Sequence, residues 1–111
     1  MDQTIALAGR EWSLPVLAVR QNRVVVPLLL ELVPAMAEAY RTARSDGAAI
    51  DRLALLKALA PRYEAMCTVC FTALTRANPD FARAEFDELP IDTEDLIAAM
   101  VPIARAAGVL R

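Results

Sequence analysis

The sequence predicts a mainly α-helical protein: a small bundle of four to five proline-kinked helices, preceded by a short N-terminal β-hairpin. Of the 111 residues, 22 are Ala, the best helix former, and only three are Gly. Apolar residues recur three and four positions apart over most of the chain, which is the helical period. At this length we expect a single domain, residues 1–111, with the hairpin in residues 1–16 and the bundle in residues 17–111.

Residues 4–14 alternate apolar side chains with small or polar ones, as the strands of a β-hairpin do. The alternating apolar residues are Ile5, Leu7, Trp12 and Leu14. Gly9-Arg10 is predicted as the two-residue turn between the strands. Because a lone hairpin is marginal in water, we expect it to pack on a helix or to pair with a strand of another chain.

Residues 18–43 predict a long amphipathic helix. Its apolar stripe consists of Val25, Leu28, Leu29, Leu32, Val33, Met36 and Tyr40. Pro27 and Pro34 interrupt it, and an interior Pro removes a backbone hydrogen bond and clashes with the preceding turn. We therefore expect either a kinked helix or a helix that starts near Pro27 after a short helical turn. A turn at Ser45-Asp46-Gly47 follows.

Residues 50–77 predict the central helix of the bundle, because two apolar rows run along neighbouring faces. The first row has heptad spacing: Leu53, Leu56, Ala60, Tyr63, Cys67, Cys70, Leu74 and Ala77. The second row contains Leu55, Leu59, Met66, Val69 and Ala73. Pro61 lies inside the segment. Either the helix kinks there, or a short helix ends near Leu59 and a new one starts with Pro61 in its first turn.

A stop at residues 78–80 separates this helix from a short one over residues 81–89, which Pro90 closes. We expect this corner to fold the last helix back onto the central one, with Phe81 and Phe86 holding it shut.

The last helix is predicted to run from a cap at Asp92 or Thr93 to about Ala107. Its apolar stripe contains Leu96, Ile97, Met100, Val101 and either Ile103 or Ala104. Pro102 should bend this helix, and Gly108 should end it.

Catalytic chemistry has little support in the residues. The chain has no His, which removes the commonest general base and the commonest metal ligand. Cys67 and Cys70 form a Cys-x-x-Cys motif, but a structural zinc site needs four ligands and a redox pair sits at a helix start. Because both lie deep in a helical seam, we interpret them as small buried hydrophobes. We expect no enzyme activity, no cofactor, no metal and no small-molecule substrate.

The segment 80–95 is strongly acidic, with one Arg among seven carboxylates: Asp80, Glu85, Asp87, Glu88, Asp92, Glu94 and Asp95. The rest of the chain carries 11 basic and 7 acidic residues. One interpretation is helix capping plus a solvated face, and the other is a patch that steers a basic partner. The net charge of −2 argues against a protein that binds nucleic acid by neutralising phosphates.

Hydrophobic residues make up 57% of the chain, above the usual ~45–50%. A small domain cannot bury all of this surface. Either many Ala lie harmlessly on exposed helix faces, or an apolar face is kept for a partner or a second copy. Glu31 and Glu38 interrupt the longest apolar runs, so we expect no membrane span. The first residues lack the features of a signal peptide, so we expect a cytoplasmic protein.

The chain resembles the short tail assembly chaperones of tailed phages and prophages. The similarity rests on its length and on three stretches, which are IALAGREWSLPVLAVRQNRVVVPLLLELVPAM, FTALTRANPDFARAEFDELPI and DLIAAMVPIARAAG. It omits residues 41–65. The resemblance implies a non-enzymatic protein that binds the tape measure protein, keeps that long helical chain soluble and helps to recruit tail tube subunits in the bacterial host cytoplasm.

A chaperone of this kind would hold a helix in an apolar groove, anchored every three or four residues. Our candidate partner-binding residues are the flexible Met36, Met66 and Met100 together with the acidic Asp80, Glu85, Asp87 and Glu88. The alternatives are another small phage structural or adaptor protein, such as a connector or tail completion factor, a helical regulatory protein, or a thiol enzyme. The acidic short helix argues against a regulator with a basic recognition helix.

Overall fold

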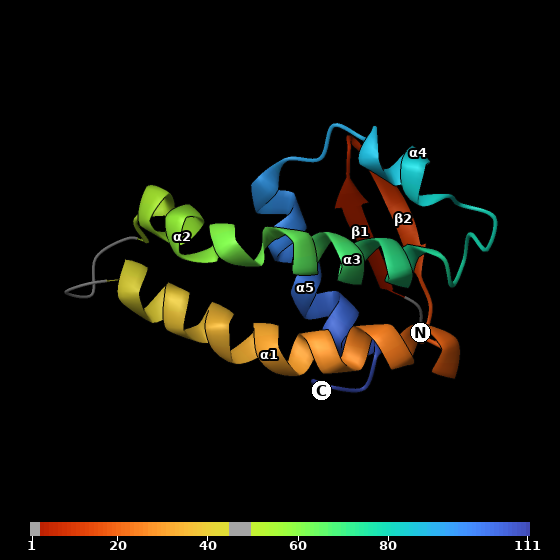
Figure 1. Cartoon of the computed structure of the whole chain (residues 1–111), viewed down its shortest axis with the longest axis horizontal. Helices are drawn as coiled ribbons and strands as arrows, with labels where there is room; N and C mark the ends of the chain where they lie inside the picture. Colours follow the sequence, from red (N-terminus) through yellow and green to blue (C-terminus); the bar gives the residue numbers. More distant parts are fainter. Residues whose placement is uncertain (1–2, 45–49) are drawn as a thin grey trace.

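The computed structural model describes residues 3–44 and 50–111 and has the predicted class, a mainly α-helical bundle with an N-terminal hairpin (Figure 1). The elements are β1 Gln3–Leu7, β2 Arg10–Leu14, α1 Val19–Ala43, α2 Arg52–Leu59, the 3-10 turn η2 Ala60–Arg62, α3 Tyr63–Leu74, α4 Arg83–Asp87 and α5 Thr93–Ala106. The predicted turn at Ser45-Asp46-Gly47 lies outside the described residues.

Helix α3 is the centre of the molecule. The succession α2, η2 and α3 runs back along α1, and α5 crosses behind α3 (Figure 1). Six of the twelve residues of α3 are buried, namely Met66, Cys67, Val69, Cys70, Ala73 and Leu74. Such a helix contacts neighbours on most of its girth, and here these are α1, α5 and β2. The predicted central helix is therefore confirmed for the part after Pro61.

The hairpin turns one residue earlier than predicted. Its turn is Ala8-Gly9, with φ of 53° and 77°, and Leu7 pairs with Arg10 across it. Positive φ at both central residues is the geometry that matches the twist of the flanking strands, and Gly adopts it at little cost. The prediction of Gly9-Arg10 was wrong because it would have placed an Arg in one of these positions. The strands pair with each other within one chain.

One face of the hairpin is buried and carries all four predicted apolar residues, Ile5, Leu7, Trp12 and Leu14. This face packs on α5 and α3. The Gln3 amide also donates to the carbonyl of Pro102 at 3.3 Å, and the backbone N–H of Leu17 donates to the carbonyl of Ala106 at 3.0 Å. Helix contacts thus supply the support that an isolated hairpin lacks.

Helix α1 is one continuous helix of 25 residues, so the alternative start near Pro27 is wrong. Pro27 and Pro34 both face solvent. The carbonyls that they deprive of a donor belong to Arg23 and Leu30, which are exposed too. Water can satisfy those carbonyls, so the helix continues through both prolines.

The predicted second helix is divided at Pro61, which lies in η2 between α2 and α3. This corresponds to the second of the two alternatives. The second predicted row is buried throughout, whereas Leu53 is 61% exposed and Tyr63 42% exposed in the heptad row. The break changes the phase between the two helices, so one regular seam cannot stay buried across it.

The corner after α3 closes as predicted. Phe81 and Phe86 lie in a cluster with Phe71 and Trp12, which we call the aromatic corner. The ring centroids of Trp12 and Phe81 are 5.3 Å apart, and those of Phe71 and Phe86 are 5.8 Å apart in an edge-on arrangement. These are favourable aromatic geometries. Beyond the corner α5 packs against α3.

Both ends of α5 match the prediction. The Asp92 carboxylate accepts from the backbone N–H of Glu94 at 2.8 Å and caps the helix start. At the other end Gly108 has a φ of 82°. The backbone N–H groups of Gly108 and Val109 donate to the carbonyls of Arg105 and Ala104, a glycine-dependent helix stop.

Candidate functional site

The surroundings of the two cysteines are those of packed core residues. Both are free and buried in α3. Burial, with Cys67 adding to it, raises the pKa of Cys70 to about 12. Burial and then the nearby Glu64 carboxylate raise the pKa of Cys67. Since the thiolate is the reactive species, both shifts favour the less reactive neutral thiol.

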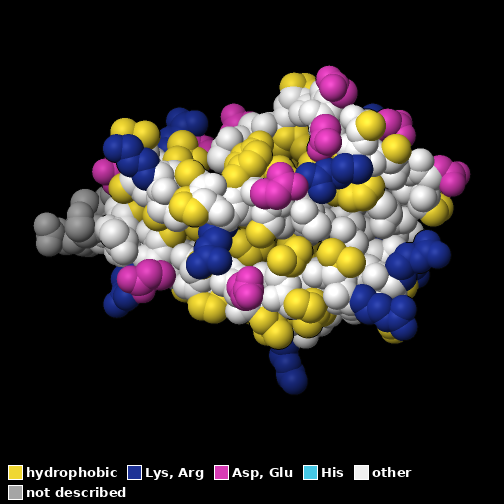
Figure 2. All heavy atoms as spheres, in the orientation of Figure 1, with side chains coloured by type: hydrophobic (Ala, Val, Ile, Leu, Met, Phe, Trp, Pro, Cys, Tyr) yellow, Lys and Arg dark blue, Asp and Glu magenta, His cyan; other side chains and the backbone are white. Residues whose placement is uncertain are grey.

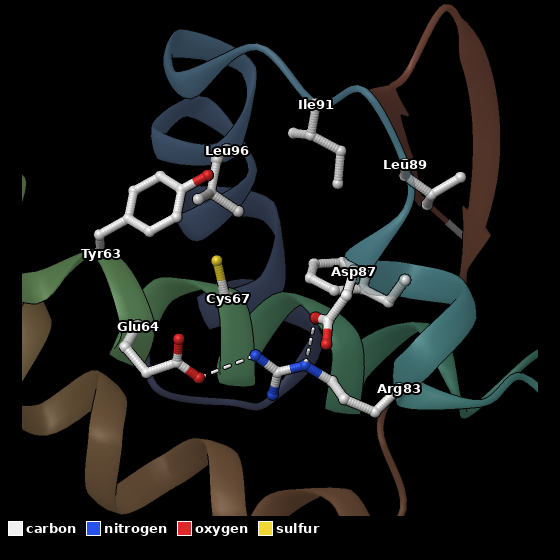
Figure 3. A pocket seen from close by; sticks show the side chains of 9 residues that line it. Tyr63, Glu64, Cys67, Arg83, Asp87, Leu89, Ile91 and Leu96 are labelled. Carbon is white, nitrogen blue, oxygen red and sulfur yellow. Dashed lines mark hydrogen bonds and ion pairs between the residues drawn. The ribbon is translucent and has the colours of Figure 1, made fainter.

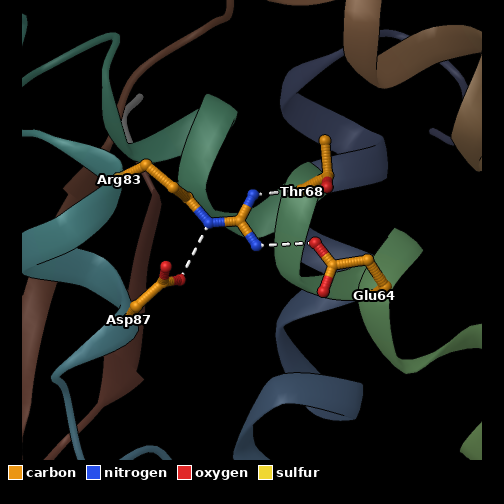
Figure 4. A network of polar contacts seen from close by, with 4 residues as sticks. All are labelled: Glu64, Thr68, Arg83 and Asp87. Carbon is orange, nitrogen blue, oxygen red and sulfur yellow. Dashed lines mark hydrogen bonds and ion pairs between the residues drawn. The ribbon is translucent and has the colours of Figure 1, made fainter.

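Arg83 organises the surface between α3 and α4 (Figure 4). Its Nη2 donates to Glu64 Oε1 at 2.8 Å, its Nε to Asp87 Oδ1 at 2.9 Å, and its Nη1 to Thr68 Oγ1 at 3.4 Å. Its hydrogen bond to Asp87 is the main cause of a raised pKa for the guanidinium. The network thus ties the short helix α4 to the central helix through a permanent charge.

A hollow of about 360 Å³ lies next to this network (Figure 3). The Cys67 sulfur points into it, and the Tyr63 ring reaches toward Leu96. Burial also raises the pKa of the Tyr63 phenol. The hollow therefore offers a neutral thiol, a neutral phenol and an Arg83 already held by two carboxylates. No activated nucleophile results from this arrangement.

The four acidic residues predicted to bind a partner do not share one role. All are exposed. Asp87 is paired with Arg83, and Glu85 accepts from the backbone N–H of Ala82 at 3.0 Å, which caps α4. Asp80 and Glu88 make no side-chain hydrogen bond or ion pair with any other described residue. Capping thus accounts for Glu85, whereas the binding of a basic partner by Asp80 and Glu88 stays a prediction.

The three predicted methionines lie in the core, with exposures of 7% for Met36 and 1% each for Met66 and Met100. They nevertheless line surface hollows. Met36 and Met100 belong to one groove between α1 and α5, and Met66 belongs to a separate hollow beside α3. The structure thus brings two of the three together and separates the third.

The groove between α1 and α5, which we call the α1–α5 groove, has a volume of about 170 Å³. Its lining is almost entirely apolar and consists of Val33, Met36, Ala37, Tyr40, Met100, Val101 and Leu110. The groove exists because α1 and α5 make far fewer contacts with each other than either makes with α3. Leu110 reaches it because the turn at Gly108 reverses the chain after α5.

The groove continues around α5 as a row of hollows. Tyr40 is shared with a hollow of about 350 Å³ between α1, α2 and α5. Leu56 and Ile97 link that hollow to one of about 370 Å³, and Tyr63 links this in turn to the hollow beside Arg83. Figure 2 shows one part of this row, where hydrophobic side chains gather in a depression between α2 and α4. This row of hollows is the candidate functional site.

Sequence reasoning named Met36 and Met100 but missed the exposed wall of the groove. Val101 was placed in a buried stripe, yet it is 40% exposed. The sequence signal for this wall is Val101 itself, an apolar residue that directly follows the buried Met100 on α5 and therefore lies at the edge of the buried stripe. Tyr40 likewise lies at the junction of two hollows rather than fully inside the core.

Among the described residues, no group of three or more Cys, Asp or Glu side chains could hold a metal ion. No described helix combines the length and apolar character needed to cross a bilayer. Comparison of the chain with protein-family models, curated proteins and solved structures found no match.

Proposed function

We propose that this protein is a tail assembly chaperone that binds a tape measure protein and keeps it soluble, without enzymatic activity, in the cytoplasm of a bacterial host. The observation that supports this function best is the α1–α5 groove. It is an open, apolar depression on a folded domain, and the row of hollows around α5 extends it. A role in recruiting tail tube subunits belongs to the same proposal.

The lining of the groove suits a helical client. An amphipathic helix presents anchors every three or four residues, and such anchors dock in apolar grooves between helices. Met36 and Met100 supply polarizable side chains that adapt to clients of varied shape. Val101 and Ala37 form the accessible rim, so a client can reach the groove without the domain unfolding. Covering the apolar stripe of a client would keep that client from aggregating.

The direct test is co-expression with the tape measure protein encoded in the same tail gene cluster, followed by affinity capture. We expect the tape measure protein to move into the soluble fraction and to be retained with the chaperone. Ala37→Glu and Val101→Glu place a charge on the rim of the groove and should reduce capture at least tenfold. Leu53→Glu is the matched control, because Leu53 is exposed and lies outside the linings of the hollows described above.

Two results would overturn the proposal. One is an absence of binding to the tape measure protein under assembly conditions. The other is the presence of this protein in purified finished particles, because a chaperone leaves the assembly. The second result would instead favour the structural or adaptor protein. Equal capture of the tape measure protein by all three variants would be compatible with the chaperone function but would show that the α1–α5 groove is not the binding site.

A further inference from the structure

Two surfaces of opposite charge lie at the same end of the molecule. Figure 2 shows Lys and Arg side chains at the lower right, where α1 begins, and Asp and Glu side chains along the upper part of that end. We define the basic end patch as Arg20, Arg23 and Arg76, and the acidic end patch as Asp80 and Glu85. The segment 75–82 joins α3 to α4 at this end (Figure 1) and contains both Arg76 and Asp80, so it contributes to each patch.

The basic end patch has no internal counter-charge in the described part of the chain. All three Arg side chains are exposed, and none forms an ion pair there. The contact that fixes Arg76 is its Nε donating to the carbonyl of Val16 at 3.0 Å, which brings Arg76 beside the start of α1. Three cations near one another repel, so this patch has charge available for a partner.

The acidic end patch is complementary. Asp80 has no ion pair with another described residue. Glu85 uses one carboxylate oxygen to cap α4, which leaves the second free to accept further hydrogen bonds. Exposed valines lie next to the basic patch and supply apolar surface to the same end, since Val16 is 71% exposed and Val19 67% exposed.

We propose that two copies of this chain associate end to end, with the basic end patch of each copy against the acidic end patch of the other. A two-fold axis through the shared end exchanges the upper and lower parts of that end, so both pairs of patches meet at once. A second copy uses both patches, whereas an unrelated acidic partner would use only one. The pairing does not involve the α1–α5 groove.

The size of the end predicts a weak dimer. The Cα positions of the whole molecule span only 28 × 25 Å across the long axis, which limits the surface that an end-to-end contact can bury. A standard stable interface covers ~800 Å² on each partner. Exposed ion pairs contribute little individually and mainly direct orientation and association rate. We therefore expect a micromolar, salt-sensitive dimer.

The test measures self-association by sedimentation velocity from 1 to 200 μM. The wild-type chain should dimerise in 50 mM salt and shift toward monomer in 500 mM salt. Arg20→Glu with Arg23→Glu, and separately Asp80→Arg with Glu85→Arg, should each weaken the dimer at least tenfold. Asp80→Arg alone retains the cap on α4 and should weaken it by a smaller factor.

An equimolar mixture of the two double variants is the decisive arm. In a mixed dimer each reversed patch meets its reversed counterpart, while the two native patches meet each other. Association should therefore return to within about threefold of wild type. The control Lys57→Glu with Arg62→Glu reverses two exposed charges elsewhere and should leave the dimer unchanged. A wild-type chain that stays monomeric at 200 μM, or a mixture that fails to restore association, would overturn the proposal.

Discussion

The aromatic corner and the α1–α5 groove are both apolar contacts between helices, yet one is closed and the other open. In the corner four aromatic rings fill the space between α3, α4 and the hairpin. In the groove, mainly aliphatic and Met side chains, together with the single aromatic residue Tyr40, line two helices that barely meet. Large planar rings can bridge a gap between elements, whereas short or narrow side chains leave it unfilled.

The distribution of aromatic residues makes the same distinction. The chain contains one Trp and three Phe, and all four lie in the aromatic corner. The two Tyr residues, Tyr40 and Tyr63, instead line hollows. A phenol keeps a polar end that can face water, so it suits the wall of an open site. The hollows that the two Tyr side chains line follow one another around α5.

Truncating a ring of the closed aromatic corner should have the largest effect on the free energy of unfolding. Phe86 is 4% exposed and contacts two other rings of the corner. Phe86→Ala should lower the free energy of unfolding by about 3–5 kcal/mol, the usual cost of truncating a buried Phe. Urea denaturation followed by circular dichroism measures this loss. Phe81→Ala, at a half-buried ring, is the comparison and should cost less. A loss below about 1 kcal/mol for Phe86→Ala would show that the corner does not hold α4 in place.

We expect an effect of intermediate size on the free energy of unfolding when the Cys70 thiol ionises. Cys70 lies on α3, which packs against both α1 and α5. Its folded-state pKa of about 12 lies above the ordinary value of 9.0. The unfolded chain therefore loses this proton first. The stabilisation is complete below pH 9 and is lost as the pH rises toward 12. At pH 10.5 the wild type should have lost about 2 kcal/mol more than Cys70→Ala, relative to each protein at pH 8.

Parallel urea titrations at pH 8, 9.5 and 10.5 measure this difference. The Cys70→Ala variant carries every other titrating group, so subtraction isolates the thiol. Identical pH profiles for the two proteins would mean that folding does not change the pKa of the Cys70 thiol, and would contradict its burial away from water.

The open region should respond least. Val101 is 40% exposed on the wall of the groove. Val101→Ala removes little buried surface and gains helix propensity, so the free energy of unfolding should change by less than about 0.5 kcal/mol. The same urea assay measures this. A loss comparable to that of Phe86→Ala would mean that the groove wall is part of the core.

The fold class followed from periodicity and composition, because those patterns report helix faces directly. The continuity of α1 through Pro27 and Pro34 did not follow. It depends on which way the two prolines face once α1 packs on α3, which is a tertiary property. The hairpin turn was missed by one residue, since the alternation of Ile5 and Leu7 with Trp12 and Leu14 allows either turn.

The candidate site was predicted only in part. Met36 and Met100 were predicted to bind a partner because Met side chains are flexible, and both line the same groove. The groove itself depends on how far apart α1 and α5 lie and on where Leu110 returns. The spacing of apolar residues along the sequence determines neither of these two features. The division of the acidic carboxylates between capping, pairing with Arg83 and free exposure likewise required the positions of α3 and α4.

The contact between β1 and α5 has a consequence for how the chain folds. The hydrogen bond from Gln3 to Pro102 joins residues 99 positions apart, and β1 packs on α5. Closing so long a loop costs entropy before any contact returns energy, and such non-local pairing slows folding. The apolar face of the hairpin stays without its final support until the last helix docks. We therefore expect the hairpin to be the last region protected from amide hydrogen exchange during refolding, after the local contacts of α1 with α2 and α3 have formed.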